Sequence, residues 1–416
     1  MLNKLWAWLI IIAITSGFIQ FFFKGSVAID AMGAALFSGA KTAVEISLGL
    51  VAVLVLWLGL FEVAQAAGVV KVLARWLSPL LTRLMPDVPR DHPAFASIGM
   101  NVAMSMLGID QGALPSGLKA MQALEELNPQ PGVATRAQQM FMVYMTASVT
   151  IFPVSILGYR LQAGAAQPAD VFLPLLLAGY VGLFAGLAYM AAVQGTRLFD
   201  KALVLGAVAL VTLLSCMAWG VGQLPHGSVT PVVTSVGNAL LLASVLLFVG
   251  LALKRGVAVY DVFLSGAAKG FGLAVELIPY LVGMLVAISL LRASGAFGVL
   301  QSVLLYLGNA ASVDIRWLDV LPQGVMKAFS GGGARAMMLD TFKLQGPDSL
   351  VGHLSSIVQG ASDTTFYILA ACAGAAKLQN IGHALTGALV VSVVSFATAV
   401  VCGLALFGYV RVFTFS

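Results

Sequence analysis

The sequence predicts an all-α integral membrane protein built from two homologous halves, with broken helices and re-entrant hairpins at its centre. The first observation is composition: 60% of the 416 residues are apolar and 9% are charged. Soluble domains contain about 45–50% apolar and about 25% charged residues. The second observation is a set of long apolar stretches, and the third is a series of features that recurs in the same order along the chain.

The apolar stretches have the length of transmembrane helices, which need about 20 residues to cross a bilayer. Transmembrane β-strands are about 10 residues long and alternate in polarity. None of the apolar stretches shows that alternation, so we expect helices to be the spanning elements. The stretches are Trp6–Phe23, Leu48–Ala67, Val171–Val193, Ala202–Val221, Pro231–Leu253 and His383–Phe407.

The amino-terminal stretch resembles a signal peptide because Lys4 precedes an apolar run. No small-x-small cleavage pattern follows, and Phe21–Phe23 lies where cleavage would be expected. We interpret this stretch as a retained first helix. The predicted location of the chain is the bacterial inner membrane, which it crosses several times.

Basic residues indicate the orientation of the predicted helices. Arg197 and Lys201 precede one apolar stretch, and Lys254 and Arg255 follow the next, whereas the loop between these stretches has no Lys or Arg. The positive-inside rule therefore predicts cytoplasmic loops at 195–201 and 254–258. The basic residues are scattered between the helices, and we expect no binding of nucleic acid.

The first recurring feature is an Ala-Lys pair followed by an apolar helix that ends in a small residue and a Gly. Ala40-Lys41 leads to Ala67-Gly68, and Ala268-Lys269 leads to Ser294-Gly295 with nearly equal spacing. Two further features follow in the same order in both parts of the chain, which predicts a duplication. They are a Pro eight residues before a polar residue, at Pro93–Asn101 and Pro322–Ser330, and a polar interruption, at Met145–Pro153 and Gly360–Thr365.

This repeat divides the chain into 1–195, a connecting segment 196–255 with two plain apolar helices, and 256–416. An odd number of membrane crossings between equivalent points would make the halves inverted, as in many secondary transporters. The sequence does not determine this number, but an inverted pair is the arrangement that we expect.

Two apolar segments are too short to cross a bilayer. Ala94–Leu107 is followed by Gly108-Ile109-Asp110-Gln111-Gly112, and Leu318–Phe329 by Ser330 and three glycines. Short apolar runs of this kind are typical of re-entrant helices. Non-helical backbone inside a membrane must be buried in protein or line a watery cavity. We therefore predict hairpin tips at 107–115 and 330–335 that face inward.

Several longer motifs resemble the bacterial spore maturation proteins A and B, of the nucleoside-recognition or gate-domain group. Residues up to about 195 resemble the A protein, and residues from about 255 resemble the B protein, so the chain looks like an A–B fusion. The A-like motifs are WLGLFEVAQAAG at 57–68, HPAFASIGMNVA at 92–103, LGIDQGALPSGLKAM at 107–121 and SVTIFP at 148–153. The B-like motifs are LIPYLVGMLVAISLLRASGA at 277–296, FSGGGARA at 329–336, GPDSLVGHL at 346–354 and QGASDTTFYI at 359–368.

The resemblance implies similarity to nucleoside transporters and to the gate domains of ferrous-iron transporters. The sequence departs from the A-type pattern, which has an Asn-Ala-Ala-Thr-Pro core where this chain reads Gln111-Gly112-Ala113-Leu114-Pro115. Where the A-type pattern has Asn-Thr-Ser at the second break, this chain has Met145-Thr146-Ala147. Where the B-type pattern has a Glu, this chain has Asp363. The first-half site is therefore less polar than the family pattern.

The clearest candidate site is the polar island Gln359–Thr365 inside an apolar segment. A charged residue at membrane depth costs about 2.5–3.5 kcal/mol on translocon scales and is by default a functional hypothesis. The alternative is a surface loop, or a helix cap at Asp363. We expect Asp363, with Ser362, Thr364 and Thr365, to face Asp110 across the interface of the halves.

Two other polar groups accompany this island. Ser330–Gly333 beside Arg335 lacks the Gly-Lys-Ser/Thr ending of a phosphate loop, so the glycines either allow close helix packing or form a hairpin tip that meets a solute. Asp110, Asn101 and Gln111 form the matching island in the first half. The full set of predicted binding residues is Asn101, Asp110, Gln111, Thr146, Ser148, Thr150, Ser330, Gly331, Gly332, Gln359, Ser362, Asp363, Thr364 and Thr365.

Other ionisable residues have simpler interpretations. Glu45 lies four residues after Lys41, which predicts a helical ion pair. Glu62 and Glu276 lie in apolar helices near basic residues, and we expect structural roles for them. The histidines and the three cysteines have no ligand spacing. We expect no disulfide, metal centre or cofactor.

The leading functional hypothesis is a permease that moves a small polar solute or ion through a site between the halves. A second is a membrane structural or regulatory factor, such as an envelope-maturation protein, and a third, less favoured, is a ferrous-iron gate. We do not expect an enzyme, because no nucleophile–base pair or zinc motif is present. Its expected partners are the lipid bilayer and the solute, and the sequence leaves open whether the chain forms a homo-oligomer.

Overall fold

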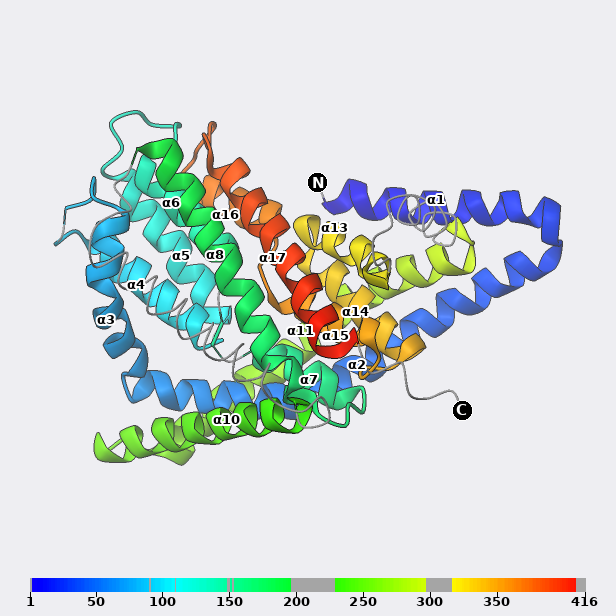
Figure 1. Cartoon of the computed structure of the whole chain (residues 1–416), viewed down its shortest axis with the longest axis horizontal. Coiled ribbons are helices and arrows are strands. Elements are labelled where there is room, and N and C mark those ends of the chain that lie inside the picture. Colours follow the sequence, from blue (N-terminus) through cyan, green and yellow to red (C-terminus); the bar gives the residue numbers. More distant parts are fainter. Residues whose placement is uncertain are drawn as a thin grey trace.

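The structure is a computed structural model that describes residues 2–89, 91–108, 110–147, 150–151, 153–195, 229–296 and 316–408. Within these residues all the regular elements are helices, which confirms the predicted all-α class. A body of packed helices carries an arm formed by α1, α2 and α11 (Figure 1). The first-half helices are α1 (Leu2–Lys24), α2 (Ser26–Ala66), α3 (Val69–Leu84), α4 (Pro93–Met106), α5 (Asp110–Glu125), α6 (Arg136–Ala147), α7 (Val154–Gln162), η1 (Pro168–Val171) and α8 (Phe172–Gln194). The later helices are α10 (Val229–Lys254), α11 (Val259–Ala293), η2 (Arg316–Val320), α13 (Leu321–Phe329), α14 (Gly331–Gln345), α15 (Leu350–Gly360), α16 (Thr365–Ala375) and α17 (Ala384–Phe407).

The order and length of helices recur in the two halves. Helices α5, α6 and α8 have 16, 12 and 23 residues, and α14, α15 and α17 have 15, 11 and 24. A Pro lies in the first turn of α4 and of α13. This agreement supports the predicted duplication.

The repeated pair of a small residue and a Gly lies at the carboxy-terminal ends of equivalent helices. Helix α2 is followed by Ala67 and by Gly68 at φ 68°, and α11 by Ser294 and by Gly295 at φ 72°. A positive φ is the usual conformation after a helix end, and it favours Gly because Gly has no Cβ. The repeat is therefore explained by one backbone requirement that occurs twice.

Equivalent helices of the two halves pack directly on each other. A Cβ at Gly266 or Gly270 of α11 would lie 2.4 Å from Leu58 O or 2.6 Å from Leu54 O of α2. In the α8–α17 pair, a Cβ at Gly182 would lie 1.8 Å from the hydroxyl of Ser395. Glycines four residues apart allow close helix approach in membranes. The halves are thus joined by two tight helix crossings, α2 with α11 and α8 with α17.

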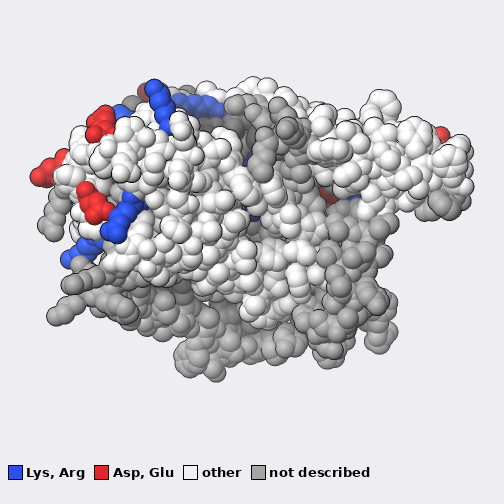
Figure 2. All heavy atoms as spheres, turned by 90° about the horizontal axis from the view of Figure 1, so that it is seen from above, with Lys and Arg blue, Asp and Glu red and all other residues white. Residues whose placement is uncertain are grey.

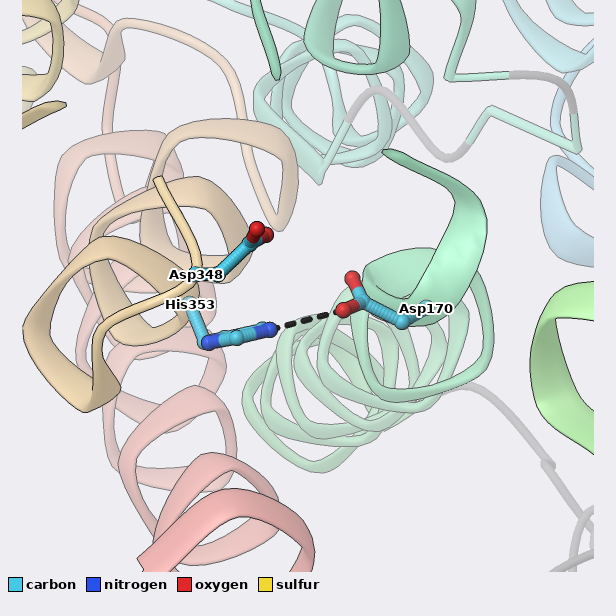
Figure 3. Close-up of side chains that lie close together, drawn as sticks. All are labelled: Asp170, Asp348 and His353. Atoms are coloured by element: carbon cyan, nitrogen blue, oxygen red, sulfur yellow. Dashed lines mark hydrogen bonds and ion pairs between the residues drawn. The ribbon is translucent and has the colours of Figure 1, made fainter. Parts of the chain in front are cut away.

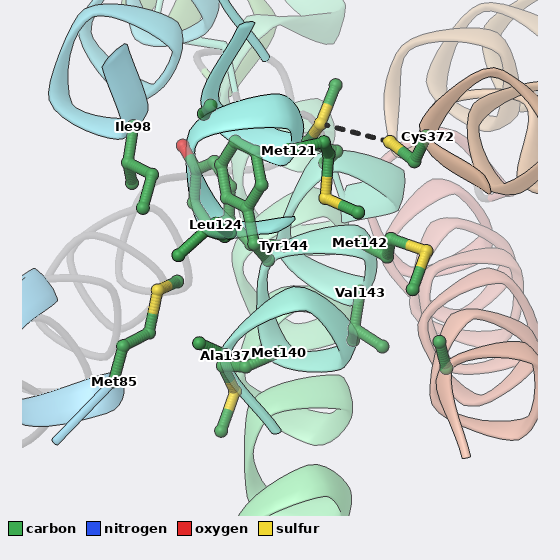
Figure 4. Close-up of a cluster of buried hydrophobic side chains, with 14 of the residues drawn as sticks. Met85, Ile98, Met121, Leu124, Ala137, Met140, Met142, Val143, Tyr144 and Cys372 are labelled. Carbon is green, nitrogen blue, oxygen red and sulfur yellow. Dashed lines mark hydrogen bonds between the residues drawn. The ribbon is translucent and has the colours of Figure 1, made fainter. Parts of the chain in front are cut away.

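The buried core also crosses the boundary between halves. Figure 4 shows the core around α4, α5 and α6, in which Met121, Met140 and Met142 are fully buried. Cys372 of α16 joins this core from the second half, and its sulfur lies 3.5 Å from the sulfur of Met145. Because side chains from both halves fill one core, the halves cannot separate without exposing it.

The described helices include membrane-spanning candidates. Pro168–Gln194 and Ala384–Phe407 are long and apolar enough to cross a bilayer, and 51–66 with 69–84 qualify as one span bent by 67°. The predicted stretches Trp6–Phe23 and Pro231–Leu253 lie in α1 and α10, whereas Ala202–Val221 lies outside the described residues. The chain is therefore a membrane protein, with fewer long apolar helices in its described part than the sequence predicted.

The distribution of charge on the surface agrees with a membrane location. Figure 2 shows charged side chains gathered at the α3–α6 end of one face and few on the α1–α2 arm. The arm exposes large apolar side chains, including Phe22 at 84% and Phe37 at 76%. Lys41 and Glu45 form the predicted i,i+4 ion pair at 3.8 Å, and Glu62 pairs with Lys269 of α11 at 2.7 Å. These ion pairs agree with the structural interpretation of Glu45 and Glu62.

Candidate functional site

A cavity of about 130 Å³ lies between the halves and is bounded by residues from both. We refer to it as the interhalf cavity. Its walls are polar or small for the most part, in contrast to the apolar cores on either side. The lining residues are Gly108, Thr150, Pro153, Ser155, Ile156, Tyr159, Lys327, Gly331, Arg335, Gln359, Gly360, Ser362, Asp363 and Thr364.

Four interruptions of helices meet at this cavity. The first separates α4 from α5 and contains Gly108 at φ 75°, and the second separates α6 from α7 and contains Thr150. The third is Ser330, between α13 and α14, and the fourth is 361–364, between α15 and α16. The first and third breaks are shorter than the predicted tips 107–115 and 330–335, because helix resumes at Asp110 and Gly331.

Hydrogen bonds between the breaks supply partners for backbone groups at the helix ends. The N–H of Ile151 donates to the carbonyl of Met106 at 2.7 Å, which joins the second break to the first. The N–H of Asp363 donates to the carbonyl of Thr146 at 2.8 Å, which joins the fourth break to the second. Helix ends leave unpaired polar groups that lipid cannot satisfy. The breaks therefore stabilise one another as a set.

The third break places the amino-terminal end of α14 at the cavity. Ser330 is the N-cap, and its hydroxyl accepts a hydrogen bond from Gly333 N at 3.0 Å. A Cβ at Gly331 would lie 2.4 Å from the hydroxyl oxygen of Thr364. The close approach of α14 to the fourth break therefore requires a Gly at 331.

Lys327 of α13 is a buried cation at the cavity, with 5% exposure. Its ammonium donates to the carbonyl of Val358 at 3.2 Å and to that of Gln359. These carbonyls lie in the last turn of α15, where the helix dipole favours a positive charge. Lys327 thus occupies the place of a carboxy-terminal helix cap while it faces the cavity.

Arg335 of α14 is the second cation of the cavity. Its guanidinium carbon lies 5.4 Å from the centre of the Tyr159 ring. Arg335 therefore packs on an aromatic side chain from the other half of the chain in a cation–π contact. Its Nε is buried and has no hydrogen-bond partner among the described residues. The carboxylate that lines the cavity, Asp363, accepts from Thr364 N at 2.6 Å.

Six of the predicted binding residues line the cavity: Thr150, Gly331, Gln359, Ser362, Asp363 and Thr364. Thr146, Ser330 and Thr365 lie in or beside the breaks and are buried. The hydroxyl of Thr146 donates to Met142 O, and that of Thr365 is 2.6 Å from the hydroxyl of Ser392. These three side chains support the wall of the cavity, and Gly332 follows Gly331 in α14.

Asn101 has a different position from Ser330, although both follow a Pro by eight residues. It lies inside α4, and its amide donates to the carbonyl of Ala113 on α5 at 2.7 Å. It therefore joins the two helices on either side of the first break and is not among the residues that line the cavity. Ser148 lies outside the described residues, as do the side chains of Asp110 and Gln111.

A second group of charges lies between the halves and is fully buried at its centre. Arg160 of α7 has 0% exposure and ion pairs with Asp170 at 2.9 Å and with Asp348 at 3.0 Å. Its guanidinium also donates to Pro347 O at 2.7 Å and to Pro168 O at 3.2 Å. His353 Nε2 lies 2.7 Å from Asp170 Oδ2, and a dashed line marks this contact in Figure 3. We refer to Arg160, Asp170, Asp348 and His353 as the Arg160 cluster.

The three side chains in Figure 3 have the spacing of metal ligands, with ligand atoms within 4.8 Å of one another. Arg160 Nη2 lies 2.9 Å and 3.0 Å from the two carboxylates and 3.4 Å from His353 Nε2. The guanidinium therefore occupies the position in which a metal would contact these groups. The cluster is an ion-pair network that joins the halves, and its chemistry does not require a metal.

Two curated proteins of Bacillus subtilis (strain 168) match this chain. Spore maturation protein A is 33% identical over 178 residues, which are 43% of this chain and 88% of that protein. Spore maturation protein B is 34% identical over 154 residues, 37% of this chain and 85% of that protein. The chain belongs to the spore maturation protein A and B family. No family model and no solved structure matches it.

The A and B proteins match different parts of this chain, which confirms the predicted resemblance. The motifs FSGGGARA and QGASDTTFYI, on which the B resemblance rested, surround the interhalf cavity. The motif GPDSLVGHL contains Asp348 and His353 of the Arg160 cluster. The B-like motifs therefore contribute to both groups of charges at the interface.

Sequence reasoning missed five ionisable residues of this interface: Arg160, Asp170, Lys327, Asp348 and His353. Each is an ionisable residue near an apolar helix, and this is the general pattern that identified Asp363. Lys327 lies in the short segment Leu318–Phe329 and could have been found on that ground. The pairing of Arg160 with residues 10 and 188 positions away could not have been found, because nothing in their spacing indicates contact.

Proposed function

We propose that this protein is a multi-pass inner-membrane permease that moves a small polar solute through the interhalf cavity. The observation that carries the proposal is the convergence of four helix breaks, two from each half, on one polar cavity. A chain that needed only to fold in a membrane would have continuous helices, because each break leaves backbone groups without intrahelical partners.

The charges at the cavity support the same proposal. Ionisable residues within membrane segments are costly, and they commonly line the paths of solutes and ions. Lys327, Arg335 and Asp363 lie around one cavity, on two helices and a break. Sites of this kind in secondary transporters lie where repeats meet and are formed by discontinuous helices.

The arrangement of the repeats suggests how the cavity would open. The two halves meet through the pairs α2–α11 and α8–α17, in which each helix packs on its counterpart. We propose that the halves are an inverted repeat and that rocking of one half against the other exposes the cavity to each side in turn. The breaks then act as re-entrant hairpins that face the cavity.

A second candidate function is that of a non-transporting membrane factor in spore or envelope maturation. The names of the two matching proteins favour it. The Arg160 cluster also favours it, because a buried network that joins the halves would oppose their relative motion. A ferrous-iron gate has less support, because no Cys, Met or His is among the described residues that line the cavity.

Cysteine accessibility separates the two main candidates. We would place a single cysteine at Ser362, which lines the cavity, in a chain whose three native cysteines are replaced. Ser356, with 0% exposure in α15, is the matched control position. A membrane-impermeant thiol reagent would be added to either side of sealed vesicles of known orientation.

A permease predicts that Ser362→Cys reacts from both sides, because the cavity opens to each in turn, and that Ser356→Cys reacts from neither. Reaction of Ser362→Cys from one side only would contradict alternating access and favour the non-transporting factor. Reaction of Ser356→Cys would show that the labelling reports unfolding, and a folded preparation would then be required before the two candidates are compared.

A further inference from the structure

We propose that the interhalf cavity binds a compact solute that carries an anionic group, such as a carboxylate or phosphate, together with a hydrogen-bond donor. This inference rests on the proposed function, because it names the class of solute for the same cavity. It follows from the charges and the hydrogen-bonding groups that the cavity presents.

The charged groups that line the cavity do not balance. Lys327 and Arg335 are two cations, and Asp363 is the single acidic residue among the described lining residues. At this depth an uncompensated charge is expensive, and no ion pair to Arg335 is present within the described part of the chain. An anionic solute would supply the missing charge.

Arg335 is also prepared to bind such a group. Its Nε is buried and has no hydrogen-bond partner in the described part of the chain, and its guanidinium packs against Tyr159, which limits the directions it can take. A guanidinium offers five N–H donors in a planar fork that matches carboxylate and phosphate oxygens. An arginine whose position is restrained and whose N–H groups are not all used in the protein is typical of an anion-binding site.

The end of α14 adds backbone donors beside Arg335. The first four N–H groups of a helix lack intrahelical acceptors, and here Ser330 satisfies those of Gly333 and Ala334. The N–H groups of Gly331 and Gly332 come before them, and Gly331 lines the cavity. Helix amino-termini favour anions through these N–H groups and through the helix dipole.

The second part of the solute follows from Gln359 of α15, which lies beside Gly331 in the cavity wall. Gln359 is buried, with 8% exposure, and its Oε1 has no hydrogen-bond partner in the described structure. The orientation of the amide follows from its Nε2, which donates to Gly331 O at 3.4 Å. An acceptor left without a partner in a buried site is costly, so the solute should provide an N–H or O–H group.

The groups that line the cavity are therefore of two kinds. Lys327, Arg335 and the start of α14 can donate to an anionic group, and the side chains of Gln359 and Asp363 can accept from a donor group of the same molecule. A cavity of about 130 Å³ limits the solute to a small molecule. A neutral analogue of the same shape would leave the excess positive charge of the cavity without a counter-ion and should bind far more weakly.

The test measures binding to the full chain in lipid nanodiscs with probes of one carbon skeleton. L-glutamate carries anionic groups and a donor, glutarate carries only anionic groups, and glutaramide carries donors without charge. Inorganic phosphate is a fourth probe, which separates a general anion site from one for carboxylates. Isothermal titration gives the affinities, and thermal unfolding gives an independent measure because a bound ligand stabilises the folded state.

We expect glutamate to bind more tightly than glutarate and glutaramide to bind weakly or not at all. Arg335→Gln should weaken the binding of both carboxylate probes by about tenfold or more, the effect of losing one charge-assisted hydrogen bond. Arg335→Lys should retain part of the affinity. Lys343→Gln is the matched control, because Lys343 lies on the same helix and bonds Thr42.

Gln359→Met tests the donor end separately. It should reduce the affinity for glutamate and leave that for glutarate unchanged, because glutarate at neutral pH has no donor for Gln359. Equal binding of glutarate and glutaramide, or the absence of anion-dependent binding with all four probes, would overturn the inference. Selective anion binding combined with one-sided labelling of Ser362→Cys would overturn the permease and leave the anion site standing.

Discussion

Two groups of buried charge lie between the halves of this protein, and they differ in how completely their members are paired. In the Arg160 cluster the guanidinium contacts two carboxylates and two backbone carbonyls, and no part of Arg160 is exposed. At the interhalf cavity, Arg335 lies over an aromatic ring, and its buried Nε has no hydrogen-bond partner among the residues that the structure describes. The same type of side chain therefore has its charge fully paired in the Arg160 cluster and incompletely paired at the cavity.

This difference separates a structural arginine from a functional one. A buried ion pair that is complete contributes little net stability compared with apolar packing, but breaking it is strongly unfavourable. A buried cation without a counter-ion costs free energy in every folded molecule. The Arg160 cluster thus fixes how the halves meet, and the open charges at the cavity are explained best by a ligand that completes them.

The two groups are linked through helices α7 and α15. Tyr159, which packs on Arg335, precedes Arg160 in α7, and Gln359 of the cavity lies two turns after His353 in α15. The closed cluster therefore holds one end of both helices while their other residues line the cavity. The ion pairs of the Arg160 cluster can in this way hold the residues that line the interhalf cavity in position.

The largest expected effect is from Arg160→Gln. The change leaves Asp170 buried without its cation, and breaking a buried pair in this way costs about 3–5 kcal/mol of folding free energy. Thermal and denaturant unfolding in detergent measure the loss. A free energy of unfolding equal to that of wild type within experimental error would mean that the cluster does not hold the halves together. The contrast with the cavity would then fail.

Lys327→Met should have the next largest effect. The ammonium donates to the carbonyls of Val358 and Gln359, and hydrogen bonds to charged groups contribute about 1.5–3 kcal/mol. The apolar side chain removes the cost of burying a charge, so we expect a net loss of about 1–2 kcal/mol. A loss equal to that of Arg160→Gln would place Lys327 with the closed cluster instead of with the cavity.

Asp348→Asn should cost less because Asp348 is at the edge of the cluster, where its side chain is 42% exposed. Solvent screens such a pair, and exposed ion pairs contribute about 0–1 kcal/mol. The amide can still accept from Ala166 N, which Asp348 contacts at 2.8 Å. A double-mutant cycle with Arg160→Gln measures the coupling, and a value above that range would show that the edge of the cluster is as well shielded as its centre.

The smallest effect on stability is expected from Arg335→Gln. No carboxylate of the described structure loses a partner, and the neutral amide removes an uncompensated charge. The free energy of unfolding should stay within about 0.5 kcal/mol of wild type or rise. A loss of several kcal/mol would show that Arg335 is a structural residue and would remove the basis of the comparison.

Much of the scaffold was predictable because it depends on local rules. The small residue and Gly after α2 and α11 occur at helix ends that need a positive φ. The polar interruptions that begin at Gly108 and Gly360 in the sequence appear as breaks after α4 and after α15, because Gly, Asp and Thr interrupt an apolar run. The polar island at Asp363 was identified as a site because charge is rare in such segments.

Other features depend on contacts between distant residues. The equal Pro spacing suggested that Asn101 and Ser330 are equivalent, but α4 continues for five residues past Asn101 whereas α13 ends before Ser330. Whether a helix continues past a polar residue depends on the neighbours that pack there. Asn101 has an acceptor on α5, and Ser330 caps the helix that follows it.

The amino-acid sequence was sufficient to predict the class of protein, the recurring order of its helices, its kinship with the spore maturation proteins, and the segments in which polar residues interrupt apolar ones. These properties follow from composition, period and local backbone preference, which act over a few residues. The folded arrangement of distant helices was needed to show that Arg160 is paired and that Arg335 has no ion pair among the described residues. The free energy of a buried charge depends on the groups within a few ångströms of it, and those groups come from helices nearly 200 positions apart.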